Sequence, residues 1–227
     1  MNANEVASKD TFDQNKSLPC TIDVSHQDLE VWPDEDQIPH RVTTINACKN
    51  KLTTVISFAR FSGLLDVDIS RNLIVTLEGM DLLMLVNLRK LDISRNLLTS
   101  VDQLATDLRS LEVLLCQHNS ISELPNGMGK LIRLKSLNIS FNKLTTLGSQ
   151  LEQNTFLENL NVTNNENMSF AELGERARRL IDRRILLSSK MQRRALIVIA
   201  LKVSENVILR EQSLILSKLS SHSAPHS

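Results

Sequence analysis

The chain has 227 residues, enough for one domain of ordinary size and a short appendage. Its 41% apolar and 23% charged residues are typical of a globular protein, and only six Gly and five Pro exclude collagen-like or Pro/Gly low-complexity architectures. The 26 basic and 26 acidic residues cancel, which argues against a protein that binds polyanions over its whole surface. Aromatic residues make up only 3%, so we expect Leu, Ile and Val to fill the core.

The N-terminal 17 residues are polar and lack the apolar centre of a secretory signal, and we expect 1–17 to be disordered. The three cysteines, Cys20, Cys48 and Cys116, are widely spaced and odd in number, which does not indicate a disulfide framework. No run of apolar residues is long enough for a spanning helix. These features predict a cytoplasmic location, with the nucleus as the alternative.

An amide side chain recurs every 22 to 24 residues, and this period indicates a repeat architecture. The recurring residues are Gln27, Asn50, Asn72, Asn96, Asn119, Asn142 and Asn165. Each stands at position 9 of the frame L-x-x-L-x-L-x-x-N-x-L, so the seven repeats begin at residues 19, 42, 64, 88, 111, 134 and 157. The copies at 88–98 and 134–144 are the clearest, and the first and last copies are the weakest.

Position 14 of every repeat provides an independent check, because it was not used to find the frame. It is apolar in all seven repeats: Trp32, Val55, Leu77, Val101, Leu124, Leu147 and Phe170. No single repeat can bury its own apolar face, so the repeats must stack on one another, with atypical units at the two ends.

This pattern resembles the leucine-rich repeat of the typical class found in cytosolic proteins. The stretch ISELPNGMGKLIRLKSLNIS in repeat five is similar to the Ras-associated and plant intracellular groups, and repeats three and four resemble the phosphatase-1-regulator type. The resemblance covers 18–170. It implies an α/β solenoid (horseshoe) with a parallel concave sheet of about seven strands and an asparagine ladder. It also implies a non-catalytic scaffold that binds a protein on its concave face, such as a small GTPase pathway component or a phosphatase catalytic subunit.

Strand alternation predicts which side chains face the partner. Positions 4 and 6 should point into the core, while positions 5, 7 and 8 should point outward. We expect paired charges beside an exposed apolar spot, and hot spots favour aromatic residues and Arg. The candidate partner-binding residues are Asp68, Arg71, Asp92, Arg95, Val113, Leu115, His118 and Phe141. The alternative is that Asp68 and Arg71, and likewise Asp92 and Arg95, merely neutralise one another.

We expect no enzymatic activity, cofactor, metal or small-molecule substrate. The sequence lacks the common nucleotide-binding, serine-hydrolase and metalloprotease motifs. A trio of Asp23, His26 and Cys48 falls on adjacent strands, but an open sheet offers no pocket for nucleophilic catalysis. Cys116 and His118 are two residues apart and should point in different directions, so they do not form a metal pair.

The period changes after Phe170, and 171–219 reads as helix without proline. From Glu172 to Leu219 there are eleven basic and five acidic residues, a balance of +6, so the neutral total conceals a basic segment. Three interpretations remain open: a cap on the last repeat, a partner-binding or self-associating helix, and a segment that docks on an anionic membrane or nucleic acid. The tail 220–227 should be disordered. The sequence leaves the oligomeric state open.

Overall fold

The computed structural model describes residues 20–33, 38–104, 108–147 and 149–168. The predicted disordered segments 1–17 and 220–227 and the predicted helical segment 171–219 lie outside the described residues.

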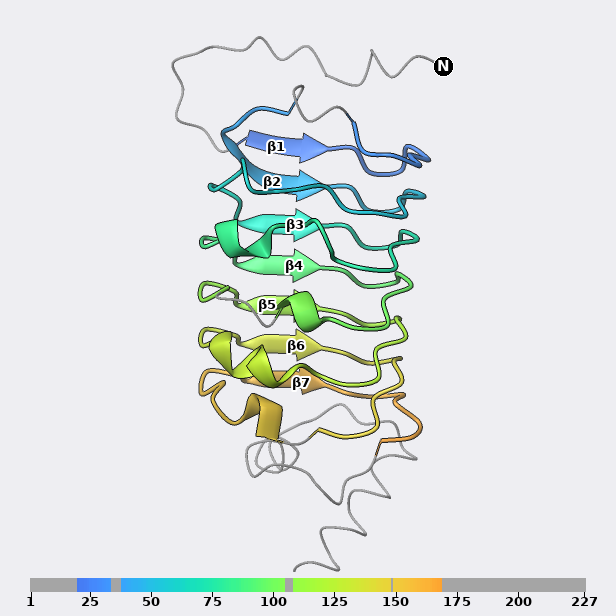
Figure 1. Cartoon of the computed structure of the whole chain (residues 1–227), viewed down its shortest axis with the longest axis vertical. Coiled ribbons are helices and arrows are strands. Elements are labelled where there is room, and N and C mark those ends of the chain that lie inside the picture. The colour runs from blue at the N-terminus through green and yellow to red at the C-terminus, as the bar shows by residue number, and fades with distance from the viewer. Residues whose placement is uncertain (1–19, 34–37, 105–107, 148, 169–227) are drawn as a thin grey trace, which may run out of the picture. The chain divides into compact units, whose positions relative to one another are not determined.

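Each repeat contributes one short strand to a parallel sheet, as predicted. The strands are β1 (Cys20–Asp23), β2 (Val42–Asn46), β3 (Asp66–Asp68), β4 (Lys90–Asp92), β5 (Val113–Leu115), β6 (Ser136–Asn138) and β7 (Asn159–Asn161). They pair in chain order, from β1 to β7, in one seven-stranded sheet (Figure 1). The register joins equivalent positions, since Val67 pairs with Leu91 and Leu91 with Leu114. The sequence frame therefore predicts the register.

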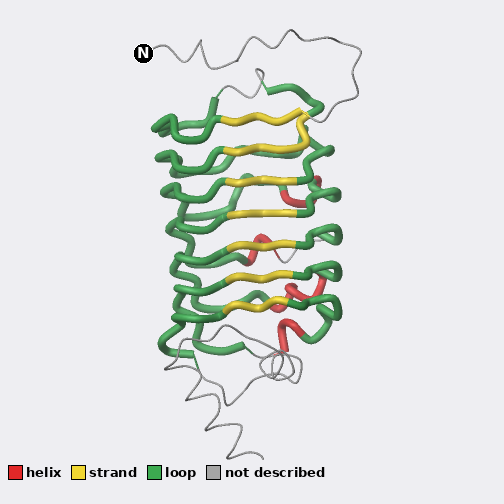
Figure 2. Tube along the Cα trace, turned by 180° about the vertical axis from the view of Figure 1, so that it is seen from behind, coloured by secondary structure: helices red, strands yellow, loops and turns green. Residues whose placement is uncertain are grey.

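Short 3-10 helices follow four of the strands and form a wall separate from the sheet (Figures 1 and 2). They are η3 (Leu82–Met84), η4 (Asp102–Leu104), η5 (Asn126–Lys130) and η6 (Ser149–Leu151). A repeat of 22 to 24 residues leaves room for only about one tight turn on the return path, which suits the 3-10 helix.

The core lies between the two walls and contains the residues that the frame predicts, together with return-loop residues that it does not, among them the fully buried Phe58 and Phe61. At positions 4 and 6 of repeat four, Leu91 and Ile93 have no exposed surface. Position 14 is also buried in repeats two to six, at Val55, Leu77, Val101, Leu124 and Leu147. Trp32 of repeat one is half-buried and meets the Phe58 ring edge-on at 5.7 Å. Phe170 lies outside the described residues.

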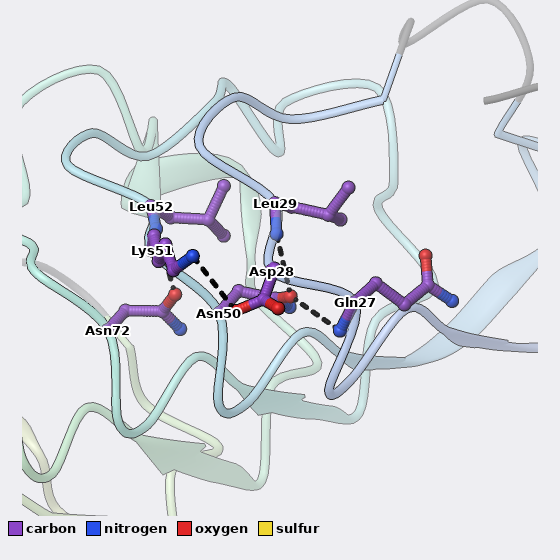
Figure 3. A network of polar contacts seen from close by, with 7 residues as sticks. All are labelled: Gln27, Asp28, Leu29, Asn50, Lys51, Leu52 and Asn72. Carbon is purple, nitrogen blue, oxygen red and sulfur yellow. Dashed lines mark hydrogen bonds and ion pairs between the residues drawn. The ribbon is translucent and has the colours of Figure 1, made fainter. Parts of the chain in front are cut away.

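The asparagine at position 9 connects each repeat to the one before it. Asn50 accepts hydrogen bonds at Oδ1 from the backbone N–H groups of Gln27 (2.9 Å) and Leu29 (3.1 Å), as Figure 3 shows. Its Nδ2 donates to the carbonyl of Val24 at 2.8 Å. The side chain always reaches backward, and no turn precedes β1 among the described residues, so Gln27 has no such bond to make within them.

Consecutive asparagines share a carbonyl at position 6. The carbonyl of Ile69 accepts from Asn72 at 3.1 Å and from Asn96 at 3.0 Å, and that of Ile93 accepts from Asn96 and Asn119, both at 3.1 Å. The same sharing occurs at Ala47, Cys116 and Ile139. The ladder is therefore continuous from repeat two to repeat seven.

Two local features explain irregular positions in the return loops. A Cβ added to Gly129 would lie 2.8 Å from Oε1 and 3.1 Å from Cβ of Gln153, so the following repeat requires a glycine there. Asn154 is fully buried and donates to the carbonyls of Met128 and Leu131, both at 2.9 Å. It occupies the core position that apolar residues fill in the preceding repeats.

Candidate partner-binding face

The side of the sheet that points away from the core, together with the turn that follows each strand, is called the open face below. Its most regular feature is the left-handed backbone at position 8, where φ lies between 54° and 58° in all seven repeats. These residues are His26, Lys49, Arg71, Arg95, His118, Phe141 and Asn164. Their backbone N–H groups donate to the position-7 carbonyl of the next repeat, for example from Arg71 to Ser94 and from Arg95 to Gln117, both at 2.8 Å. Position 8 is thus a continuous column.

The residue types in this column are unusual for its backbone conformation. Glycine and asparagine adopt a left-handed conformation at the lowest cost, and other residues lose roughly 1–2 kcal/mol there. Only repeat seven uses asparagine, at Asn164, whereas repeats two to six carry Lys, Arg, Arg, His and Phe. The sequence keeps large side chains in the column despite the backbone cost, and this points to a role for the side chains themselves.

The acidic residues at position 5 bind the backbone rather than the neighbouring arginines. Oδ1 of Asp68 accepts the backbone N–H of Ser70 at 2.9 Å, and Oδ1 of Asp92 accepts that of Ser94 at 2.9 Å. Within the described ranges, no ion pair joins Asp68 to Arg71 or Asp92 to Arg95. The two arginines and the two aspartates therefore form no direct ion pairs with one another, and Arg71 and Arg95 are exposed at the open face.

Asp68 and Asp92 are direct neighbours in the sheet register. Burial is the main cause that raises the pKa of Asp92, the hydrogen bonds from Ser94 lower it, and the negative charge of Asp68 raises it further. At position 3 the charges do pair, because Nζ of Lys90 lies 3.5 Å from Oδ2 of Asp66. The open face of repeats three and four therefore has an acidic strip over the strands and a basic strip along the following turns.

His118 and Phe141 follow the two arginines in the column and form an aromatic stack. Their ring centroids are 4.2 Å apart and the ring planes differ by 12°. Burial lowers the pKa of His118, and the positive charges of Arg95 and Arg71 lower it further. The neutral imidazole is therefore favoured, which suits a ring that stacks on Phe141.

The predicted apolar spot is only partly exposed. Phe141 is 47% exposed, whereas Val113 and Leu115 are half-buried in the sheet. Leu115 also changes the hydrogen bonding of repeat five. In each of the six other repeats, position 5 is Asp or Asn, and its side-chain oxygen accepts a hydrogen bond from the backbone N–H at position 7. In repeat five the N–H of Gln117 has no such acceptor among the described residues. The Gln117 side chain has a buried Oε1 without a hydrogen-bond partner in the same part of the chain.

A second set of exposed apolar side chains lies in repeat three, outside position 8. It comprises Leu65, Leu73, Val75, Leu83, Met84 and Val86, with exposures from 36% to 64%. The repeat frame did not predict this exposed apolar set, because it predicts burial only at positions 1, 4, 6, 11 and 14 of each repeat.

In the trio on repeats one and two, the pKa shift of Cys48 is opposite to the one that an activated thiol needs. Burial and the nearby Asp68 raise the pKa of the Cys48 thiol, whereas a catalytic cysteine needs a lowered pKa. Hydrogen bonds from Ser25 occupy the carboxylate of Asp23 and lower its pKa. In the described part of the chain, no three His, Cys, Asp or Glu side chains lie close enough to hold a metal ion. Over the same residues, no helix has the length and apolar character needed to cross a bilayer.

Comparison with known proteins supports the fold. No family model matches the chain. An adenylate cyclase of Schizosaccharomyces pombe is 34% identical over 92 residues, which is 40% of this chain and 5% of that protein. The solved structure of a Leptospira interrogans LRR protein is 23% identical, with a TM-score of 0.51, over 57% of this chain and 36% of that one. The chain thus spans well under two thirds of these relatives.

Two further solved structures show weaker likeness. One is an internalin of Listeria monocytogenes, with 22% identity over 57% of this chain and 40% of that one. The other is the plant peptide hormone receptor RGFR1 in complex with RGF2, with 22% identity over 56% of this chain and 21% of that one. Both have a TM-score of 0.49. The likeness to the Leptospira protein shows the fold: this chain contains a leucine-rich repeat solenoid.

Proposed function

We propose that this chain is a non-catalytic interaction scaffold that binds a protein partner on the open face of repeats three to six. The observation that supports the proposal is the position-8 column, in which large charged and aromatic side chains are kept in a costly left-handed conformation. Arg71, Arg95 and Phe141 are the exposed members of this column in the four repeats, and Arg and aromatic residues dominate the energetics of protein interfaces.

The acidic strip adds specificity. Asp68 and Asp92 repel an acidic partner that lies over the strands, while Arg71 and Arg95 attract one that lies along the turns. Val113, Leu115 and the His118 ring supply apolar contact next to the arginines. All eight residues predicted from the sequence therefore belong to the proposed site, with Gln117 as an addition.

The experiment compares two triple variants with the same change in composition. The first is Arg71→Gln, Arg95→Gln and Phe141→Ala. The matched control, Arg89→Gln, Arg133→Gln and Phe156→Ala, removes two exposed arginines and one exposed phenylalanine outside the column. Full-length wild type and both variants are used for affinity capture from native lysate, with quantitative mass spectrometry of the captured proteins.

We expect proteins that wild type and the control retain to be lost from the first variant, while the melting temperature stays the same. Equal capture by all three would contradict the proposal. Capture that instead depends on Leu83 and Met84 would move the interface to the apolar set of repeat three. By resemblance, components of small GTPase pathways and phosphatase catalytic subunits are the proteins to look for first, and we propose the cytoplasm as the place of the interaction.

The basic segment 171–219 supports a second proposal, docking on an anionic membrane or nucleic acid with the repeats as the recruiting part. It rests on the charge balance of +6 in the sequence alone, because the segment lies outside the described residues. Binding of the full-length protein to anionic liposomes or RNA should then fall steeply with salt concentration. Binding that is absent, or insensitive to salt, would exclude it.

A further inference from the structure

We propose that the open face of repeats three to five binds an extended peptide segment in which an acidic residue and an apolar residue stand two positions apart. This inference rests on the proposed function and specifies the chemistry of the partner. It follows from three features of the described residues: a pair of arginines that form no ion pair with an acidic residue, an apolar contact in the next repeat, and unused hydrogen-bonding groups of Gln117 in that repeat.

The arginine pair provides the acidic subsite. Arg71 and Arg95 occupy the same position in consecutive repeats, and their backbones are hydrogen-bonded to equivalent carbonyls. Both are exposed, and no carboxylate of the described ranges forms an ion pair with either. Two guanidinium groups at one strand spacing, about 4.8 Å, can hold one carboxylate between them.

The nearby carboxylates restrict where an acidic residue can lie. Asp68 and Asp92 stand over the strands, each with one oxygen bound to the N–H of a serine at position 7. They repel a second negative charge from the acidic strip. An acidic peptide side chain is therefore confined to the arginine side, along the turns that follow the strands.

The apolar subsite lies in the next repeat. Leu115 is half-buried at position 5 of repeat five, and the His118 ring is fixed by its stack on Phe141. Along the position-8 column, from the midpoint of the arginine pair to His118 is one and a half strand spacings, or about 7 Å, with Leu115 beside this line on the strand. Two residues of an extended chain cover about 6.7 Å, and side chains two positions apart point to the same side. The distance therefore selects residues i and i+2.

Gln117 lies in repeat five, between Leu115 and His118 along the chain, and supplies contacts for the peptide backbone. Leu115 replaces the Asp or Asn of the other repeats, so the backbone N–H of Gln117 lacks the usual acceptor among the described residues. The side-chain Oε1 of Gln117 also has no hydrogen-bond donor among them. A peptide unit crossing repeat five offers one N–H and one carbonyl. With a change of side-chain rotamer, Gln117 can accept the first and donate its backbone N–H to the second. An extended peptide backbone can thus satisfy both groups of Gln117, whereas the backbone N–H and carbonyl groups of a helical peptide are already hydrogen-bonded to one another.

The test uses the full-length protein and phage-displayed random decapeptides, followed by fluorescence anisotropy with labelled synthetic peptides of the enriched sequence. We expect enrichment of Asp or Glu two positions from Leu, Ile, Val, Met or Phe. In an extended peptide, moving the acidic residue by one position turns its side chain away from the two arginines. The dissociation constant should then rise at least about tenfold, because one charge-assisted hydrogen bond contributes at least that factor to the affinity. The double variant Arg71→Gln and Arg95→Gln should raise the dissociation constant by a similar factor.

The control is Lys49→Gln with Lys143→Gln, which removes the same charge from exposed residues outside the two subsites, one of them in the same column. It should change the dissociation constant less than about twofold. Enrichment of basic peptides, of helical spacing (i, i+3 or i+4), or of no motif overturns the inference, as does equal loss of affinity in the control. If the inference fails while the first triple variant still loses its partner, the proposed function stands. If capture is also unchanged, both fail.

Discussion

Replacing one interior asparagine of the ladder should measure how strongly adjacent repeats are coupled. Asn96 is 6% exposed and makes bonds on both sides of the interface between repeats three and four. Its Oδ1 accepts the N–H of Ile74 at 3.1 Å, and its Nδ2 donates to the carbonyls of Ile69 at 3.0 Å and Ile93 at 3.1 Å. The substitution Asn96→Ala removes these three bonds and a longer one, of 3.3 Å, from Nδ2 to the carbonyl of Ser94.

The three losses are not equal. The carbonyls of Ile69 and Ile93 keep a second donor, from Asn72 and Asn119, so each loses about 0.5–1.5 kcal/mol. The N–H of Ile74 loses its acceptor, and a buried unsatisfied donor costs about 1–3 kcal/mol. The free energy of unfolding should therefore fall by about 2–6 kcal/mol, which is a large part of the stability of a domain of this size.

The measurement is urea unfolding followed by circular dichroism, with Gln27→Ala as the control. Gln27 occupies the same frame position, but its side chain makes no hydrogen bond with the described residues, so its loss should change stability by less than about 0.5 kcal/mol. If Asn96→Ala were no more destabilising than Gln27→Ala, the asparagine ladder would not couple adjacent repeats, which would contradict the prediction.

Three other predictions test the open face and the thiols. Arg95→Val should lower the free energy of unfolding by about 1–2 kcal/mol, because a β-branched residue fits a left-handed backbone poorly, while Arg95→Asn should not; equal unfolding midpoints would contradict this. By NMR, His118 should titrate below the ordinary histidine pKa, and Arg95→Gln should raise its pKa; no rise would mean that burial alone acts. Iodoacetamide at neutral pH should leave Cys116 unmodified in the folded protein, because burial raises its pKa, and should label Cys48 more slowly than a free thiol. Rapid labelling of Cys48 would reopen the question of catalysis.

The sequence was sufficient to predict the parts of the fold that depend on period and polarity. The spacing of the asparagines locates every repeat, and alternation places Leu91 and Ile93 in the core, where both are fully buried. It also assigns Cys116 to the core and His118 to the surface, as the structure has them. These features follow from burial of apolar side chains, which any repeat must achieve in the same way.

Features that depend on backbone conformation could not be predicted. Arg95 and Phe141 are poor left-handed residues, so nothing in their identity indicates φ values of 54°. The hydrogen bond from the backbone N–H of Ser94 to Asp92 was not predicted either. The position of Asp92 three residues before Arg95 suggested a pair of opposite charges, but the Asp92 carboxylate instead accepts the backbone N–H two residues along the chain. Asn154, buried at a core position, has no signal in the frame. The substitution of Leu115 for an acid or amide was visible, but its effect on Gln117 was not.

The backward direction of the asparagine bonds has a consequence for how such a chain can change its length. The position-9 asparagine of each repeat forms hydrogen bonds with the backbone of the turn in the preceding repeat (Figure 3). The repeat's own turn is bonded in the same way by the asparagine of the repeat that follows. A unit duplicated or deleted anywhere inside the array therefore leaves every remaining turn with a donor and an acceptor. The asparagine ladder thus permits growth and shrinkage by whole units in the interior. Contacts specific to one pair of repeats, such as that of Gly129 with Gln153, have to be kept when the number of repeats changes.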